Sequence, residues 1–148
     1  MTKYVIRVDT SLYTSESNSA VGTSFQIINA SCDTEEVIFE DTRGQTMQTN
    51  HSTEAELFGI ETAIEIFNNK YVQDEDVIVL HVKCDCDSAV QLLQDKNPTF
   101  TYCDNILSRV DDFYSVKWEV VKRSSVHELD TKAKRVQRRV RDNHPEFD

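Results

Sequence analysis

The chain has 148 residues, a length that suits one domain with a single hydrophobic core. Apolar residues make up 39% of it, no apolar run approaches the ~20 residues that span a bilayer, and the first residues lack the pattern of a secretory signal. We therefore expect a cytoplasmic monomer with no membrane segment. The formal net charge of −10, from 26 acidic and 16 basic residues, argues against a surface that attracts nucleic acid everywhere and suits a salt-rich cytoplasm.

Strand-like runs dominate the first third of the chain. Residues 3–9, 22–29 and 36–42 are rich in β-branched and aromatic residues and are separated by short polar segments, which predicts an antiparallel meander. Apolar residues then recur at helical spacing in 52–69, where Ser52 and Thr53 provide a capping signal.

The remaining elements alternate between strand and helix. Residues 76–85 predict a strand buried on both faces, 88–93 and 103–113 predict two helices, 115–121 a fifth strand, and 127–142 a polar, basic last helix. The resulting order, β-β-β-α-β-α-α-β-α, predicts a five-stranded mixed sheet with helices on its faces, of the α/β (α+β) class. We expect one domain over residues 1–142 and a frayed tail over 143–148.

Four cysteines are too few and too irregularly spaced for a disulfide framework, so we expect free thiols at Cys32, Cys84, Cys86 and Cys103. The Cys84-x-Cys86 pair could form half of a zinc site, but no second pair or suitably spaced histidines accompany it. Small, partly buried apolar residues are the better interpretation.

Basic residues concentrate at the C-terminal end, where nine of them lie between Lys117 and Asp148. Two interpretations remain open. These residues either form a local cationic face on which a polyanion docks, or belong to a solvated helix whose basic end is favoured by the helix dipole.

Acidic residues fall where a mixed sheet gathers its ligands, at the carboxyl ends of central strands. The candidates are Asp9, Asp85 or Asp87, Glu54 or Glu56, and Asp130. Each alone has an ordinary explanation as a turn residue, a helix cap, a first-turn acid or a surface group. Brought together, they would repel each other unless a cation were present, which favours a hard divalent metal such as Mg²⁺ or Mn²⁺.

Four segments that carry these acids resemble the successive catalytic segments of the type 1 ribonuclease H family, including its reverse-transcriptase-like archaeal and bacterial branch. They are "VIRVDTS", "TEAELFGIETAI", "VIVLHVKCDCDSAVQLL" and "VKWEVVKRSSVHELDTKAKRV", and the similarity runs from about residue 3 to 142. On this chain the family pattern falls on Asp9, Glu56, Asp87 and Asp130. Asp85 and Asp87 share one face of an extended strand, so spacing cannot choose between them; the resemblance selects Asp87 because Ser88 follows it.

The resemblance implies a ribonuclease H-like fold and hydrolysis of the RNA strand of RNA–DNA hybrids, which leaves 5′-phosphate and 3′-hydroxyl ends. It also implies that the four acids are catalytic and hold two divalent cations, one orienting the attacking hydroxide and one stabilising the leaving oxygen. The candidate substrate contacts are Ser11, Ser52, Thr53, Arg123 and His127. Arg123 is the better candidate for a phosphate contact, because it is always charged and close in sequence to the metal site. His127 could instead be an ordinary solvent-exposed residue of a first helical turn.

Two departures from the family pattern bear on function. Thr10 follows Asp9 where the family usually has glycine, and the segment between Asp87 and Asp130 is too short for the basic protrusion with which some members grip the hybrid. The alternatives to a ribonuclease H are an inactive binding or scaffold module of the same fold, and a nuclease of this fold that acts on another nucleic acid.

Overall fold

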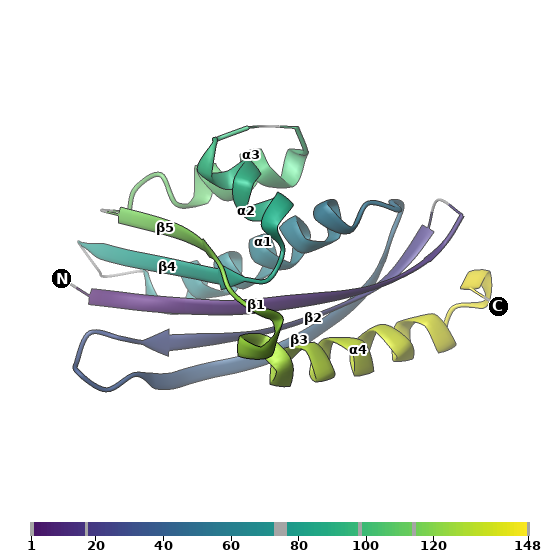
Figure 1. The fold of residues 1–148 in the computed structure, drawn as a ribbon, viewed down its shortest axis with the longest axis horizontal. Coiled ribbons are helices and arrows are strands. Elements are labelled where there is room, and N and C mark those ends of the chain that lie inside the picture. Colours follow the sequence, from purple (N-terminus) through teal and green to yellow (C-terminus); the bar gives the residue numbers. More distant parts are fainter. Residues whose placement is uncertain (1, 17, 73–76, 98, 114, 148) are drawn as a thin grey trace.

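The computed structural model describes residues 2–16, 18–72, 77–97, 99–113 and 115–147 (Figure 1). Its five strands are β1 (Thr2–Ser15), β2 (Asn18–Asn29), β3 (Glu36–Met47), β4 (Ile78–Cys84) and β5 (Ser115–Val120). Its α-helices are α1 (Ser52–Tyr71), α2 (Asp87–Gln94), α3 (Thr101–Arg109) and α4 (His127–Asp142), with short 3₁₀ turns at Arg123–Val126 and Pro145–Phe147.

The strands form one mixed sheet in the order β3-β2-β1-β4-β5. β1 pairs with β2 and β2 with β3 in antiparallel fashion, whereas β1 and β4, and β4 and β5, are parallel. The predicted element order and the five-stranded mixed sheet are confirmed. The three meander strands are longer than predicted, and β1 continues for six residues beyond Asp9.

The main core lies between the sheet and α1, α2 and α3. Side chains of β1 and β4 alternate, so that Tyr4, Ile6 and Val8 together with Leu80 and Val82 enter this core. Helix α4 lies on the opposite face of the sheet and packs over β1, β2 and β3 (Figure 1). None of the helices in the described part of the chain combines the length and apolar character needed to cross a bilayer.

The burial of β4 differs from the expectation. Only alternate residues of the strand are fully buried, because α4 packs over β1 to β3 while the same face of β4 carries half-buried polar residues such as His81 and Lys83. The apolar start of this segment, Ile78 to Leu80, therefore signals one buried face and not two.

The C-terminal segment also differs from the expectation of a frayed tail. Residues Pro145–Phe147 form a 3₁₀ turn, and Phe147 is only 5% exposed. Its ring packs edge-on against the Tyr13 ring, with the ring centroids 6.2 Å apart. The Arg141 guanidinium lies over the Tyr13 ring, 5.2 Å from its centroid. The turn thus anchors the end of the chain to the far end of β1.

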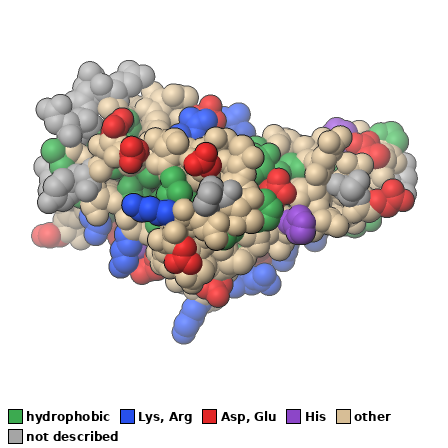
Figure 2. Space-filling view, turned by 90° about the horizontal axis from the view of Figure 1, so that it is seen from above, with side chains coloured by type: hydrophobic (Ala, Val, Ile, Leu, Met, Phe, Trp, Pro, Cys, Tyr) green, Lys and Arg blue, Asp and Glu red, His purple; other side chains and the backbone are tan. Residues whose placement is uncertain are grey.

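Surface charge is mixed on the side seen in Figure 2, where acidic and basic side chains are interspersed without a continuous basic area. The four cysteines carry free thiols, as expected.

Helix α4 approaches the sheet closely because glycines lie beneath it. Gly22 of β2 and Gly44 of β3 are paired across the two strands. A Cβ atom at Gly22 would overlap the Ala133 carbonyl oxygen and lie 2.5 Å from the Gln137 backbone nitrogen, whereas one at Gly44 would meet only the side-chain ends of Val136 and Val140. The backbone contact at Gly22 cannot be relieved by a change of rotamer.

We therefore expect Gly22→Ala to lower the free energy of unfolding by about 2–3 kcal/mol, as an overpacking change does. Gly44→Ala should cost less, about 1 kcal/mol, because the closest atoms there are methyl groups of Val136 and Val140 and not backbone atoms. Urea unfolding followed by circular dichroism checks the pair. Equal losses for both variants would contradict the close backbone approach at Gly22.

Candidate metal centre

Parallel pairing of β1 with β4 brings two aspartates to one point of the sheet. The ladder runs from Thr2 opposite Ile78 to Arg7 opposite Lys83, after which β4 ends at Cys84. The same register carried two residues further sets Asp9 opposite Asp85. Both residues therefore lie at the carboxyl end of β4, where neighbouring strands of such sheets place their ligands.

Helix α1 contributes the third carboxylate. Glu56 lies in the second turn of the helix, and the helix crosses the sheet closely at Gly59, where a Cβ atom would overlap the Thr10 hydroxyl. Thr10 also donates hydrogen bonds to Glu56 from its backbone amide and its hydroxyl. The residue that follows Asp9 thus holds the Glu56 carboxylate in place.

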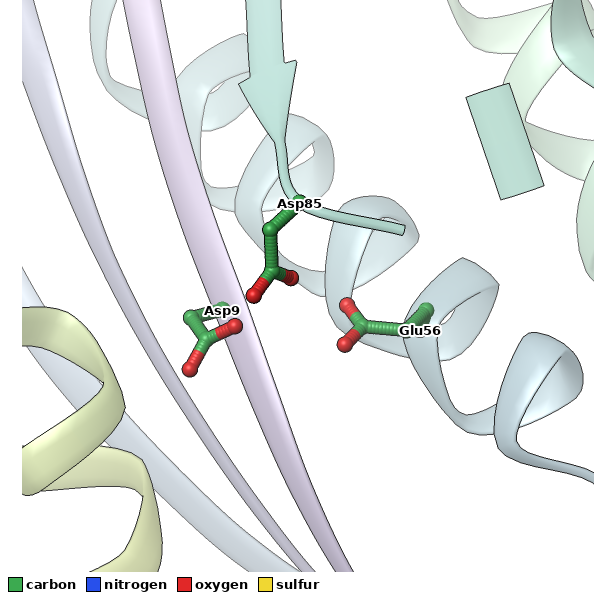
Figure 3. A group of neighbouring side chains, drawn as sticks. All are labelled: Asp9, Glu56 and Asp85. Atoms are coloured by element: carbon green, nitrogen blue, oxygen red, sulfur yellow. The ribbon is translucent and has the colours of Figure 1, made fainter. Parts of the chain in front are cut away.

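Asp9, Glu56 and Asp85 point toward one another (Figure 3), with one ligand oxygen from each within 4.8 Å of the others. Asp9 is 2% exposed, Glu56 is 8% exposed, and the Asp85 side chain is 11% exposed. One oxygen of Asp9 and one of Glu56 are buried without a hydrogen-bond partner among the described residues. Buried carboxylate oxygens without donors are suited to a cation.

The electrostatic cost of this arrangement appears in the pKa values. Burial, the charge of Asp85 and the nearby Asp130 raise the pKa of Asp9 to about 8. Burial, followed by the charges of Asp9 and Asp85, raises the pKa of Glu56 well above its ordinary range, and the Thr10 hydrogen bonds oppose this only in part. Two carboxylates ~4 Å apart repel by about 4 kcal/mol at an effective dielectric constant of about 20.

The fourth predicted acid, Asp130, lies beside this group in the first turn of α4. Its side chain is mostly buried, and the Lys134 ammonium, one turn further along the helix, is 3.0 Å from its carboxylate. Burial would raise the pKa of Asp130, but the hydrogen bonds that its carboxylate accepts from Lys134 and from the protonated Asp9 outweigh it, so that the pKa lies below the ordinary value. Asp130 therefore stays ionised next to Asp9.

Asp87 does not join the group. It is exposed as the first residue of α2, whose N-cap position is taken by Cys86, and its charge lies in the first turn of that helix. The structure groups Asp85, and not Asp87, with Asp9 and Glu56, and a role of Asp87 stays a prediction from the resemblance. Alternation along an extended strand stops at Cys84, so Asp85 and Asp87 no longer share a face, and it is Asp85 that the β1–β4 register aligns with Asp9. The predicted strand ended at Asp85 and the observed one ends at Cys84, so what the sequence reasoning missed is that Asp85 and Asp87 do not lie in one extended strand.

The predicted substrate-contact residues differ in where they lie relative to the carboxylates. Ser11 is half-buried on β1 two residues beyond Asp9, and His127 is exposed at the start of α4. Arg123 is exposed on the 3₁₀ turn that follows β5, with its Nε atom 3.5 Å from an Asp85 oxygen. The structure therefore brings Arg123 to the group.

Ser52 and Thr53 open α1 and do not cap it, since the N-cap residue is His51 and makes no side-chain cap. The Thr53 hydroxyl is 2.6 Å from that of Ser88 at the start of α2. Two helix beginnings are thus joined next to the carboxylates.

No curated protein matches the chain in sequence. Among solved structures, the N-terminal ribonuclease H domain of a Mycobacterium tuberculosis protein is similar over 95% of this chain and 96% of its own, with a TM-score of 0.75 and 15% identity. Ribonuclease H1 from the halophilic archaeon Halobacterium salinarum is similar over 93% of this chain and 98% of its own, with a TM-score of 0.69 and 13% identity. LC11 ribonuclease H1, solved in complex with an RNA/DNA hybrid, is similar over 92% of this chain and 97% of its own, with a TM-score of 0.73 and 11% identity.

These likenesses define the class of the molecule as the ribonuclease H fold, as expected from the sequence. The model of the family described as reverse transcriptase-like matches residues 14–136. The chain belongs to this reverse transcriptase-like family of ribonuclease H-fold proteins, in agreement with its resemblance to type 1 ribonuclease H.

The raised pKa of Asp9 predicts how pH and cations affect the cation-free protein. The folded state keeps a proton that the unfolded chain releases above its ordinary pKa of 3.8, so this group's contribution to stability falls as the pH rises toward about 8. At pH 8, Mg²⁺ or Mn²⁺ at 100 times the Kd that holds at this pH should raise Tm by about 5–10 °C. The same cation concentration at pH 5 should give a much smaller shift, because protons compete for the carboxylates.

Differential scanning fluorimetry at the two pH values, with Asp9→Asn as the matched control, measures this. The variant should be more stable than the parent at pH 8 without cations and should lose the response to cations. A cation response of the same size at pH 5, or in Asp9→Asn, would contradict a metal site at this group.

Proposed function

We propose that the protein is a divalent-metal-dependent endonuclease that hydrolyses the RNA strand of RNA–DNA hybrids, leaving 5′-phosphate and 3′-hydroxyl ends. The observation that carries this proposal is the group of Asp9, Glu56 and Asp85, with Asp130 beside it, at the end of two parallel strands in a ribonuclease H fold. The solved relative that holds an RNA/DNA hybrid has the same fold and supports the choice of substrate.

The donor set fits hard divalent ions, because it consists of carboxylate oxygens of which two are buried and unpaired. Asp9 and Asp85 would hold the ions together with Glu56 and Asp130, and we infer two Mg²⁺ or Mn²⁺ ions. Bound there, they would supply Lewis-acid stabilisation of an in-line displacement at phosphorus.

The remaining residues position the acids and the substrate. Thr10 orients Glu56, and Lys134 keeps Asp130 ionised. Arg123, always charged and next to Asp85, is placed to contact a phosphate of the bound strand. Ser11, two residues beyond Asp9, and Ser52 and Thr53, which open the helix that carries Glu56, are candidates for contacts with the sugar-phosphate backbone, including the ribose 2′-hydroxyl that distinguishes RNA from DNA. The roles of His127, a cytoplasmic location and a monomeric state stay predictions.

Cleavage of end-labelled substrates tests the proposal. With Mg²⁺ or Mn²⁺, at low and at molar salt, the RNA strand of a hybrid should be cut, while double-stranded DNA of the same sequence should stay intact. Chelation should stop the reaction. A protein that binds the hybrid without cutting it under any of these conditions would be a binding module, and cleavage of double-stranded RNA or DNA in place of the hybrid would change the substrate.

The two aspartates at the end of β4 offer a second, internal test. Asp85→Asn should lower kcat by more than about 100-fold, since even the loss of a group that only supports a metal ligand typically costs 10–100-fold. Asp87→Asn should keep activity within about threefold, since Asp87 is exposed on α2. Steady-state cleavage of the hybrid, with circular dichroism to confirm folding, measures both. Loss of activity in Asp87→Asn alone would assign the role to Asp87.

A further inference from the structure

A row of cations lies on the sheet face next to the carboxylates. Arg7 and Lys83 are direct partners in the β1–β4 ladder and come two residues before Asp9 and Asp85. Side chains two residues apart on a strand point to the same face, so Arg7 shares the face of Asp9, and Lys83 lies beside Arg7 on that face. No ion pair involving Arg7 is present among the described residues.

The row continues away from the carboxylates onto β5. His81 lies two residues before Lys83, and its ladder partner on β5 is Lys117. Glu119 lies among them, with oxygens 3.3 Å from the His81 Nε2 atom, 3.9 Å from the Lys83 Nζ atom and 3.8 Å from the Lys117 Nζ atom. Burial lowers the pKa of His81; Glu119 opposes this, and Lys83, Lys117 and Lys3 lower it further. All three lysines therefore lie close to the imidazole.

This part of the sheet is covered by long side chains in place of a helix, because α4 packs over β1, β2 and β3. Lys83 is 21% exposed and Lys117 is 68% exposed. Their aliphatic stems cover the sheet while the ammonium groups reach solvent. We call Lys3, Arg7, Lys83 and Lys117 the cationic strip. It holds four positive groups against one carboxylate, on a chain whose net charge is −10.

The other basic area of the molecule is less suited to a polyanion. A cavity of about 340 Å³ between α4 and the β2–β3 pair is lined by Lys132, Arg135 and Arg139, but also by Glu40 and Asp41. Lys132 is already 3.8 Å from the Glu40 carboxylate. The positive charge there is partly neutralised.

We propose that the sugar-phosphate backbone of the bound nucleic acid runs from the carboxylate group onto the cationic strip, where its phosphates contact Arg7, Lys83 and Lys117. The inference rests on the proposed function and adds the direction in which the substrate leaves the site. Charge complementarity between the phosphates and the cationic strip favours this occupant.

The test compares two double variants, each of which removes two positive charges. Lys83→Gln/Lys117→Gln changes the cationic strip, and Arg135→Gln/Arg139→Gln is the control on α4. Both are made in a Glu56→Gln background to prevent cleavage, and binding to a fluorescent RNA–DNA hybrid is followed by anisotropy between about 50 and 200 mM salt. The strip variant should bind about tenfold more weakly, and the slope of log K against log salt should fall in magnitude by about 2. The control should change neither.

Further variants separate charge from structure. Lys83→Arg/Lys117→Arg should retain the affinity and the slope, whereas Glu119→Gln should tighten binding because it removes the carboxylate among the cations. An unchanged slope in the glutamine double variant, an equal loss in the α4 control, or weaker binding by Glu119→Gln would each overturn the proposal.

Two outcomes separate the cationic strip from the proposed function. If the wild-type protein cuts hybrids but the strip variant binds them as the parent does, the cationic strip does not bind the substrate and the proposed function is retained. If binding depends on the strip but the wild-type protein cuts nothing, the strip is right and the proposed function is wrong.

Discussion

Parallel pairing between β1 and β4 is the constraint on which the rest of the molecule depends. It fixes which residues of two strands, more than 70 positions apart in the sequence, lie side by side. The ladder ends with Arg7 opposite Lys83, and β4 stops at Cys84 while β1 continues. Asp9 and Asp85 follow two residues further along the two segments and meet Glu56 of α1 there, so a pair of cations precedes the acids.

Mutual repulsion is the second feature of this site. Three carboxylates converge, two of them buried, and the described donors to the acids are few: Thr10 for Glu56, Arg123 for Asp85 and Lys134 for Asp130. Asp9, the most buried, has an oxygen without a partner and the pKa that is raised to about 8. The fold tolerates this because the packing of α1 and α4 on the sheet holds the backbone in place. The cost appears as the raised pKa of Asp9, which lowers the free energy of unfolding as the pH rises.

Much of this could be predicted from the sequence, because periodicity reports local structure directly. The sequence predicted the strand runs and the long amphipathic α1. It also predicted that the acids Asp9, Glu56 and Asp130 lie near one another. Asp85 could not be selected over Asp87, since the choice depends on where β4 ends, and strand ends are set by tertiary pairing that no local pattern records. Phe147 was missed for a related reason: a single aromatic near a chain end gives no periodic signal, and its contact with Tyr13 spans almost the whole sequence.

The crossing of α1 over β1 at Gly59 links packing to chemistry. The Thr10 hydroxyl fills the space beside Gly59 that a side chain would occupy, and the same residue holds the Glu56 carboxylate. The spacing between helix and strand, and with it the reach of Glu56 toward Asp9 and Asp85, is therefore set by a residue that has no side chain and touches no ligand. Evolutionary change at the contact between Gly59 and Thr10 alone could therefore alter the distance between the acidic groups while every acid is kept.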